Sequence, residues 1–358
     1  MKLQILVPHY HETAEVIKPL LDSIALQRSV KMEDVGVIIC HDGDDSIDFD
    51  FPEAQDQCDL SEFPVYQYEI KQIRIPHAGV SAARNACLDA ATADYVMFCD
   101  IDDMFYSVCG LYLIFREIEN GGFDSLVSMF IEESRMPKEL VNGLSSASSA
   151  PVHPKGDDEV VYINHDMDST FVHGKVHRRQ YLLDNKIRWN EKLTIHEDSF
   201  FNILCQNLSQ NVKYCPTPFY LWCWRDESVC RHDPKYILKT YNNMLDSNDA
   251  LVDEFIKRGV QDKAMFYTAF MIFDAYYTMN KPEWINQENR SFRDETEKRF
   301  SAYYKKHKQL WNDVPLPDKM QISNGVRARS IGEGMMMEAV TIDQWLRKIE
   351  KLSGGKRK

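Results

Sequence analysis

The chain has 358 residues, 44% hydrophobic and 27% charged, a balance that is ordinary for a soluble globular protein with material for one large domain or two. Its formal net charge of −13 argues against broad, sequence-independent binding to nucleic acid. The nine cysteines form no Cys-x-x-Cys pair and are odd in number, so we expect a reducing compartment, no disulfide framework and no zinc site.

The first part of the chain alternates strand and helix patterns. Apolar runs predict buried strands, and apolar residues at helical spacing predict helices. The expected elements are strands at residues 3–7, 35–40, 65–75, 95–99 and 125–132, with helices at residues 13–27, 81–91 and 107–120. This alternation predicts an α/β fold with a doubly wound, mostly parallel sheet flanked by helices. An acidic stretch at residues 44–62 is expected to be a surface excursion.

The composition changes twice after the last of these strands. Residues 135–158 are rich in Ser, Pro and Gly and predict a mobile loop, followed by a strand at 160–163 and short helices at 177–185 and 198–206. Beyond residue 233 the pattern is helical, at residues 235–257, 263–279, 289–308 and 335–352. We therefore predict an α/β domain at residues 1–232 and a helical C-terminal region at residues 233–358.

The sequence predicts no membrane-spanning segment. The chain begins with a strand pattern rather than the architecture of a signal peptide. The longest aromatic and apolar run, at residues 264–279, is interrupted by Asp274 and is too short to cross a bilayer. We therefore expect a cytoplasmic protein.

The most informative stretch is residues 77–103, in which a helix carrying Arg84 and Asn85 and then an apolar strand lead to Asp100-Ile101-Asp102-Asp103. Such a strand end places carboxylates at the carboxyl edge of the sheet, where α/β proteins bind ligands. Asp100 and Asp102 can face the same side of an extended segment. A solvated turn is the alternative, but motifs at other strand ends favour a divalent cation held against a diphosphate.

Two other strand ends on the same edge carry side chains that suit a nucleoside. Pro8, Tyr10 and Glu12 follow the first strand, and Asp42 follows the second. Tyr10 can pack beside a base, and the carboxylate of Asp42 can accept a hydrogen bond from a base N–H. Each feature alone is also common in turns, so the argument depends on their convergence.

Two helix starts carry further candidate groups. Arg84 lies one turn into the helix at residues 81–91, positioned to contact phosphate or base, with a surface salt bridge as the alternative. Glu197 and Asp198 precede an apolar pair at another helix start. Asp198 is therefore either a general base for an acceptor hydroxyl or only an acid that interacts with the helix dipole.

Three segments offer cations, aromatic rings or an extra ligand. Lys175 could place its ammonium group near phosphate. The aromatic residues at 219–228, including Trp222, could stack on a sugar or base, or could form a buried strand. His232 is a candidate additional metal ligand, although a single histidine is more often structural.

Together these motifs resemble the inverting family 2 glycosyltransferases of the GT-A fold. The opening VPHYHE is similar to the family's V-P-x-Y-N-E, with His11 where Asn is common, and HDGDDS is similar to its Asp-Asp-Gly-Ser turn, with His41 in place of the first acid. The closest match is GVSAARNACLDAATADYVMFCDIDD, and HGKVHRRQYL, HEDSFF and FYLWCWRDES follow in the family's order. The resemblance covers roughly residues 1–232 and not the C-terminal helices.

The resemblance implies a donor site for a nucleotide sugar, with UDP as the expected nucleotide. Asp42, Tyr10 and Arg84 would hold the nucleoside. The full set of expected donor-site residues is Pro8, Tyr10, Glu12, Asp42, Arg84, Asp100, Lys175, Glu197, Trp222 and Arg225.

The resemblance also implies a metal site and a catalytic base. Asp102, helped by Asp100 and with His232 as an extra ligand, would hold Mn²⁺ or Mg²⁺ on the diphosphate. Asp198 would take a proton from an acceptor hydroxyl, which then attacks the anomeric carbon from the face opposite the leaving group. The expected result is inversion.

Several alternatives stay open at this level. The Gln-x-x-Arg-Trp motif and the transmembrane helices of processive synthases are absent from the sequence, which favours transfer of a single sugar. A glycan is the expected acceptor, whereas a modified nucleic-acid base is open but disfavoured by the acidic charge. The C-terminal helices are expected to pack on the catalytic domain, or else to form an acceptor platform or a homodimer contact. The competing functions are a nucleotidyltransferase that releases pyrophosphate and a non-catalytic binding module.

Overall fold

The computed structural model describes residues 1–43, 66–134, 149–154, 160–164, 170–223, 235–330 and 341–352. The chain divides into two compact units, Met1–Ser228 and Val229–Lys358. The domain boundary expected at residue 232 and the acidic excursion expected at residues 44–62 both lie outside the described ranges.

The first unit is an α/β structure whose elements follow the expected alternation. In chain order they are β1 (Leu3–His9), α1 (Ala14–Ala25), the 3₁₀ helix η1 (Met32–Asp34), β2 (Val35–Asp42), β3 (Glu69–Ile75), α2 (Val80–Ala90), β4 (Tyr95–Phe98), β5 (Met104–Phe105), α3 (Gly110–Glu119), β6 (Ser125–Ser134), β7 (Ser149–Pro154), β8 (Val160–Asn164), β9 (Lys175–Arg178), α5 (Arg179–Asp184), α6 (Glu197–Leu208) and β10 (Val212–Trp222).

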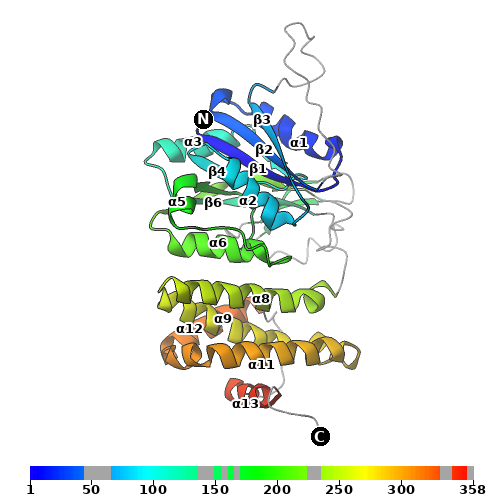
Figure 1. The fold of residues 1–358 in the computed structure, drawn as a ribbon. Helices are drawn as coiled ribbons and strands as arrows, with labels where there is room; N and C mark the ends of the chain where they lie inside the picture. The colour runs from blue at the N-terminus through cyan, green and yellow to red at the C-terminus, as the bar shows by residue number, and fades with distance from the viewer. Residues whose placement is uncertain are drawn as a thin grey trace. The chain divides into compact units, whose positions relative to one another are not determined.

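These strands form one mixed sheet of ten strands with helices on its faces (Figure 1). Its main path runs β3-β2-β1-β4-β9-β6-β10-β5, and β7 and β8 join it through β6. The pairs β3/β2, β2/β1, β1/β4 and β6/β10 are parallel, whereas β9 runs antiparallel to both β4 and β6. The parallel part is the one that the sequence predicted. The sheet is mixed because β9 is antiparallel to its neighbours, as are β5 to β10 and β8 to β6 and β7.

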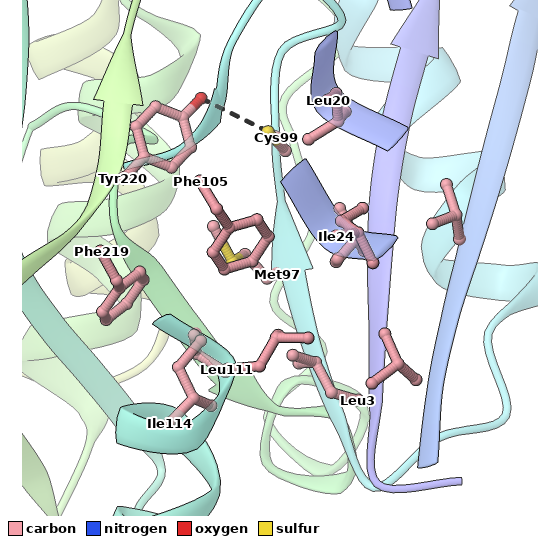
Figure 2. Close-up of a cluster of buried hydrophobic side chains, with 14 of the residues drawn as sticks. Leu3, Leu20, Ile24, Met97, Cys99, Phe105, Leu111, Ile114, Phe219 and Tyr220 are labelled. Carbon is pink, nitrogen blue, oxygen red and sulfur yellow. Dashed lines mark hydrogen bonds between the residues drawn. The ribbon is translucent and has the colours of Figure 1, made fainter. Parts of the chain in front are cut away.

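The central strands are buried on both faces, which accounts for their continuous apolar runs. On one face, Leu3 and Met97 pack with Leu20 and Ile24 of α1 and with Ile114 of α3 (Figure 2). The other face is covered by α2, which packs on β1 and β2, and by α6. Helices therefore pack against both faces of the sheet.

Two local expectations differ from the structure, and one short strand was not expected. The prediction of a loop at residues 135–158 is wrong for residues 149–154, because these residues form β7, which pairs with β8. The short helix expected from residue 177 begins at Arg179, because Lys175–Arg178 is recruited as β9 between β4 and β6. The two-residue strand β5 is too short to leave a period in the sequence. In each case strand pairing across the sheet decided the local structure.

The second unit is helical, as the sequence predicted. Its elements are α8 (Tyr236–Lys257), α9 (Gln261–Met279), α10 (Pro282–Ile285), the 3₁₀ helix η2 (Gln287–Asn289), α11 (Arg290–Asp313), α12 (Leu316–Ser330) and α13 (Ile342–Leu352). The helix α9 packs against α8, α11 and α12. Trp284, Trp311 and Trp345 are only 1%, 6% and 2% exposed, so these tryptophans belong to the core of this unit.

Within the described ranges, no helix is long and apolar enough to cross a membrane.

Candidate active site

Three parallel strands end together at one edge of the sheet in the first unit. His9 of β1 lies opposite His41 of β2, and Leu6 of β1 lies opposite Phe98 of β4. The residues that follow these strands therefore gather at the carboxyl edge, where parallel sheets bind ligands. This arrangement brings the segments of Tyr10, Asp42 and Asp100 to one side of the unit, as predicted.

The carboxylate of Asp42 holds the start of α2. Its Oδ1 accepts the backbone N–H of Ala78 at 2.7 Å, and its Oδ2 accepts that of Gly79 at 2.9 Å. Nδ1 of His77 lies 3.1 Å from the same Oδ2. Gly79 has a φ of 94°, a conformation that glycine adopts without a steric penalty. A base N–H that binds Asp42 would therefore share the carboxylate with these donors.

Tyr10 and His77 form a stacked aromatic pair beside Asp42. Their ring centroids are 4.5 Å apart with an interplanar angle of 19°. Tyr10 is 46% exposed, and Oε2 of Glu12 accepts its backbone N–H at 2.8 Å. Exposed aromatic faces beside a carboxylate suit the packing of a nucleobase. His77 opens the stretch at residues 77–103 that the sequence indicated, but the sequence assigned no role to its side chain.

His41, which stands where the resembled family has an acid, is buried with His9. Their Nδ1 atoms are 2.9 Å apart, and Nε2 of His41 lies 2.8 Å from Oε1 of Gln72. Nε2 of His9 lies 2.8 Å from the backbone oxygen of Glu12, which can only accept, so His9 donates there. This chain of contacts fixes the turn that carries Tyr10 and Glu12.

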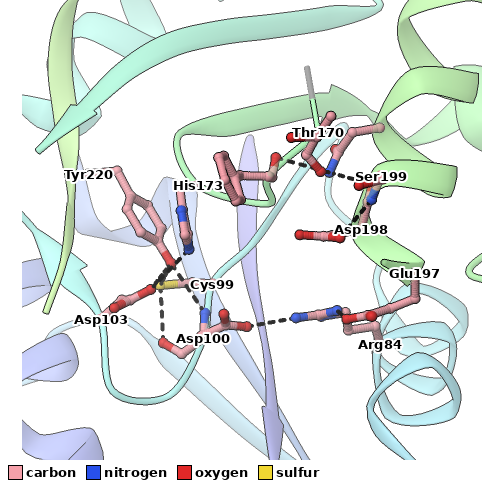
Figure 3. Close-up of polar contacts among 12 residues, drawn as sticks. Arg84, Cys99, Asp100, Asp103, Thr170, His173, Glu197, Asp198, Ser199 and Tyr220 are labelled. Atoms are coloured by element: carbon pink, nitrogen blue, oxygen red, sulfur yellow. Dashed lines mark hydrogen bonds and ion pairs between the residues drawn. The ribbon is translucent and has the colours of Figure 1, made fainter. Parts of the chain in front are cut away.

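Asp100, Asp103 and His173 form a group of ligands that suits a divalent cation. One ligand atom from each lies within 4.8 Å of those of the other two (Figure 3). Carboxylate oxygen and imidazole nitrogen are ordinary ligands for such ions. The sequence indicated Asp102, Asp100 and His232 for this role. Asp102 lies in the same turn, and His232 lies outside the described ranges.

Asp103 is bound on both oxygens by the end of β10. The hydroxyl of Tyr220 donates to Oδ2 at 2.5 Å, and the backbone N–H of Cys223 donates to Oδ1 at 2.9 Å. Nε2 of His173 lies 3.8 Å from the same Oδ2. Burial raises the pKa of Asp103 well above its usual range, and the charges of Asp100 and Asp102 add to this rise. Asp103 therefore has a structural role, because it connects β10 to the acidic motif, in addition to its place in the acidic cluster.

Arg84 contacts two carboxylates rather than standing open at the edge. Its Nη2 lies 2.8 Å from Oδ1 of Asp100, and its Nη1 lies 3.0 Å from Oε1 of Glu197. Burial opposes the charge of Asp100, but Arg84 and then His173 outweigh it and lower the pKa of Asp100. The predicted contact between Arg84 and a nucleotide stays a prediction.

Asp198 has the acidity expected of a general base. It lies in the first turn of α6, and its Oδ1 accepts the backbone N–H of Ser199 at 2.7 Å. Burial, together with the neighbouring charge of Glu197, raises the pKa of Asp198 to about 7, against the opposing effect of Arg84. Figure 3 shows Asp198 and Glu197 extending from α6 toward the acidic cluster. A carboxyl that titrates near neutral pH can take up and release a proton under physiological conditions.

Of the remaining predicted residues, the structure describes Lys175 and Trp222 but not Arg225. Lys175 is 2% exposed, and its Nζ donates to the backbone oxygens of Phe171 and His173, so it supports the loop that carries His173. Trp222 stacks on the ring of His173 at 4.9 Å and an angle of 27°. Arg225, like His232, lies outside the described ranges.

The matches to known proteins agree with this geometry. Residues 4–175 match the family model of glycosyl transferase family 2. The uncharacterized glycosyltransferase EpsJ of Bacillus subtilis (strain 168) is 21% identical over 268 residues, which is 75% of this chain and 70% of that protein. The crystal structure of S. aureus TarS 1–349 matches with a TM-score of 0.58 at 16% identity, over 98% of this chain and 90% of that one. A second crystal structure of S. aureus TarS matches with a TM-score of 0.56 at 15% identity, over 98% of this chain and 55% of that one. At these identities the structural likeness shows the fold, which is of the expected GT-A type.

Proposed function

We propose that this protein, a glycosyltransferase with a family 2 domain at residues 4–175, transfers a single sugar from a UDP-sugar to an acceptor hydroxyl. The transfer inverts the configuration at the anomeric carbon of the sugar. The observation that carries the proposal is the position of Asp198. A carboxyl with a pKa of about 7 lies on the segment that Arg84 joins to the acidic cluster. A base and a diphosphate-binding edge are the two parts that such a transfer requires.

The donor would bind along the carboxyl edge of the sheet. The exposed face of Tyr10, stacked on His77, is the surface on which the base packs, and Asp42 is the acceptor for its N–H. The acidic cluster then lies at the diphosphate end, because Asp100 follows the next parallel strand.

The residues at the diphosphate end fit Mn²⁺ or Mg²⁺. Asp100, Asp103 and His173 supply two carboxylates and an imidazole within reach of one another, and Asp102 in the same turn supplies a further carboxylate. A divalent cation bound there would offset the negative charge that develops on the departing diphosphate.

The proposed chemistry at Asp198 is general base catalysis. The ionised carboxylate takes the proton of the acceptor hydroxyl, and the acceptor oxygen forms a bond to the anomeric carbon. The bond from that carbon to the phosphate oxygen breaks, and its electron pair leaves with UDP. A positioned base of this kind contributes roughly 10²–10⁴-fold to the rate.

Product analysis tests this proposal. A thermal-shift screen of nucleotide sugars with Mn²⁺ identifies the donor, since a ligand that binds only the folded state raises the apparent melting temperature. We then expect release of UDP on incubation with an acceptor glycan, and a product with the opposite anomeric configuration by NMR. Release of pyrophosphate from a nucleoside triphosphate would instead establish a nucleotidyltransferase. Retention of configuration would contradict the role of Asp198.

A further inference from the structure

Arg84 joins two segments that both carry acids of the proposed site. Asp100 follows β4, whereas Glu197 opens α6, and each gives one oxygen to a different Nη nitrogen of the guanidinium (Figure 3). These contacts link the acidic motif to the segment of the proposed base through one side chain. We call Arg84, Asp100 and Glu197 the Arg84 brace.

The guanidinium rests on a rigid aromatic platform. Its central carbon lies 4.4 Å from the ring centroid of Trp189, a distance at which a cation is attracted to an aromatic face. Trp189 stacks on Phe201 of α6 at 4.2 Å and an angle of 4°. Asn85, the next residue after Arg84, exchanges two hydrogen bonds of 3.0 Å with the backbone of Trp189. The brace is therefore fixed from α2 and from α6 at once.

The brace leaves little of Arg84 for a substrate. Its side chain is 5% exposed, and both Nη nitrogens contact carboxylates. Its Nε is buried and has no hydrogen-bond partner within the described part of the chain. An arginine that recognises a diphosphate usually offers two N–H groups as an accessible fork, whereas this guanidinium is buried and directs each of its Nη nitrogens at a carboxylate.

Removal of this cation would disturb the acids that it holds. Asp100 and Glu197 are 33% and 13% exposed at their side chains, and Asp198 is adjacent to Glu197. Carboxylates this close disfavour one another's charged forms when no cation lies between them. They would move apart, and that movement would displace the proposed base from the acidic cluster.

We propose that Arg84 is a positioning residue, which sets the placement of Asp198 relative to Asp100 through the Arg84 brace and makes no contact with the nucleotide. This inference rests on the proposed function. It replaces the nucleotide contact that the sequence resemblance implied with a role in aligning the two halves of the site.

The test separates kcat from nucleotide binding. In Arg84→Gln we expect kcat to fall on the order of 10²-fold, the effect of misplacing a reacting group by about an ångström. We expect the Kd for UDP measured in EDTA to stay within twofold of the wild-type value. Arg299→Gln is the matched control, because Arg299 pairs with the exposed Asp246 in the helical unit and its loss should change neither quantity.

A second variant covers the case in which Arg84→Gln does not fold. Glu197→Gln keeps a hydrogen-bonding side chain but removes one ionic arm of the brace, and it should lower kcat with UDP binding intact. In the double variant the losses should be less than multiplicative, because both changes break the same contact.

The opposite results would overturn the inference. If Arg84→Gln or Arg84→Lys weakened UDP binding in EDTA while kcat was kept, Arg84 would be a nucleotide contact. Full activity in Glu197→Gln, or strictly multiplicative losses in the double variant, would show that the brace aligns nothing. A different result would contradict the proposed function itself, namely full activity in Asp198→Asn, a variant that keeps the Arg84 brace intact.

Discussion

The hydroxyl of Tyr220 donates a hydrogen bond to Asp103 at 2.5 Å across 117 residues of sequence. This contact connects β10 to the acidic motif that follows β4. The Tyr220 ring also lies against His173, with centroids 5.2 Å apart. One side chain thereby contacts two of the three residues that suit a divalent cation, so the cluster depends on β10 for its shape.

Loss of this hydroxyl should destabilise the protein. In Tyr220→Phe, the buried carboxyl group of Asp103 loses a hydrogen-bond partner, which costs about 1–3 kcal/mol. Urea unfolding would measure the change in the free energy of unfolding. Tyr214→Phe on the same strand is the control, because Tyr214 is 58% exposed and should change stability little. Equal effects of the two substitutions would contradict a specific role for the Tyr220 contact.

The loop that carries His173 requires glycine at position 174. Gly174 has a φ of 63°, and a Cβ there would lie 2.4 Å from Oγ of Ser128. Gly174→Ala should therefore lower the free energy of unfolding by more than the about 1–2 kcal/mol that the left-handed conformation alone costs. Gly121→Ala is the comparison, because Gly121 has a φ of 95° and a Cβ there would meet no neighbouring atom within 4 Å. A larger loss at Gly121 would show that the close approach to Ser128 relaxes easily.

The ligand set of the proposed metal site can be separated residue by residue. His173→Phe keeps a ring between Phe171 and Trp222 but removes the imidazole nitrogen, and it should abolish the increase in UDP affinity on addition of Mn²⁺. Asp102→Ala tests the ligand that the sequence indicated. Calorimetric titration of UDP with and without Mn²⁺ measures both. If His173→Phe kept the metal effect and Asp102→Ala lost it, the cation would not use His173.

The acidity of Asp198 makes activity and stability respond to pH in opposite directions. With a pKa of about 7, the ionised base accumulates as the pH rises, so kcat should climb about tenfold per unit below pH 7 and level off above it. Folding raises this pKa, so the stabilising contribution is present below the unfolded value near 4 and is lost as the pH rises through about 7.

Asp198→Asn should remove this loss of stability. We expect the variant to melt at a higher temperature than the wild type at pH 8 and to differ less at pH 5. Asp94→Asn, at an exposed position of the turn before β4, should leave the melting temperature unchanged at both pH values. A variant less stable than the wild type at pH 8 would contradict the buried, raised-pKa carboxyl.

The sequence predicted the strands that are buried on both faces. It failed to predict β9, which forms because it pairs with β4 and β6. The apolar runs of β1, β2 and β4 are buried on both faces, so their character is plain in the sequence. β9 carries Lys175 and His177, both buried, because Phe171 supplies a backbone acceptor and Ser125 a side-chain partner. Ser125 lies 52 residues from His177, and β9 pairs with β4 and β6 rather than with a neighbouring segment, so no local pattern predicts this strand.

The site was predictable as a set of motifs but not as a set of contacts. The positions of Asp42, Asp100 and Asp198 follow from strand ends and a helix start. That Arg84 joins Asp100 to Glu197 depends on the packing of Trp189, 104 residues from its hydrogen-bond partner Asn85. A motif identifies which groups are present, whereas the packing determines which of these groups contact one another.

The most direct measurement of the central claim is the rate of sugar transfer by Asp198→Asn with the identified donor, Mn²⁺ and acceptor, alongside its Kd for UDP. Asparagine keeps the size and a hydrogen-bonding oxygen but cannot accept the proton. We expect transfer to fall by roughly 10²–10⁴-fold with UDP binding unchanged. Transfer at the wild-type rate would contradict the assignment of Asp198 as the base.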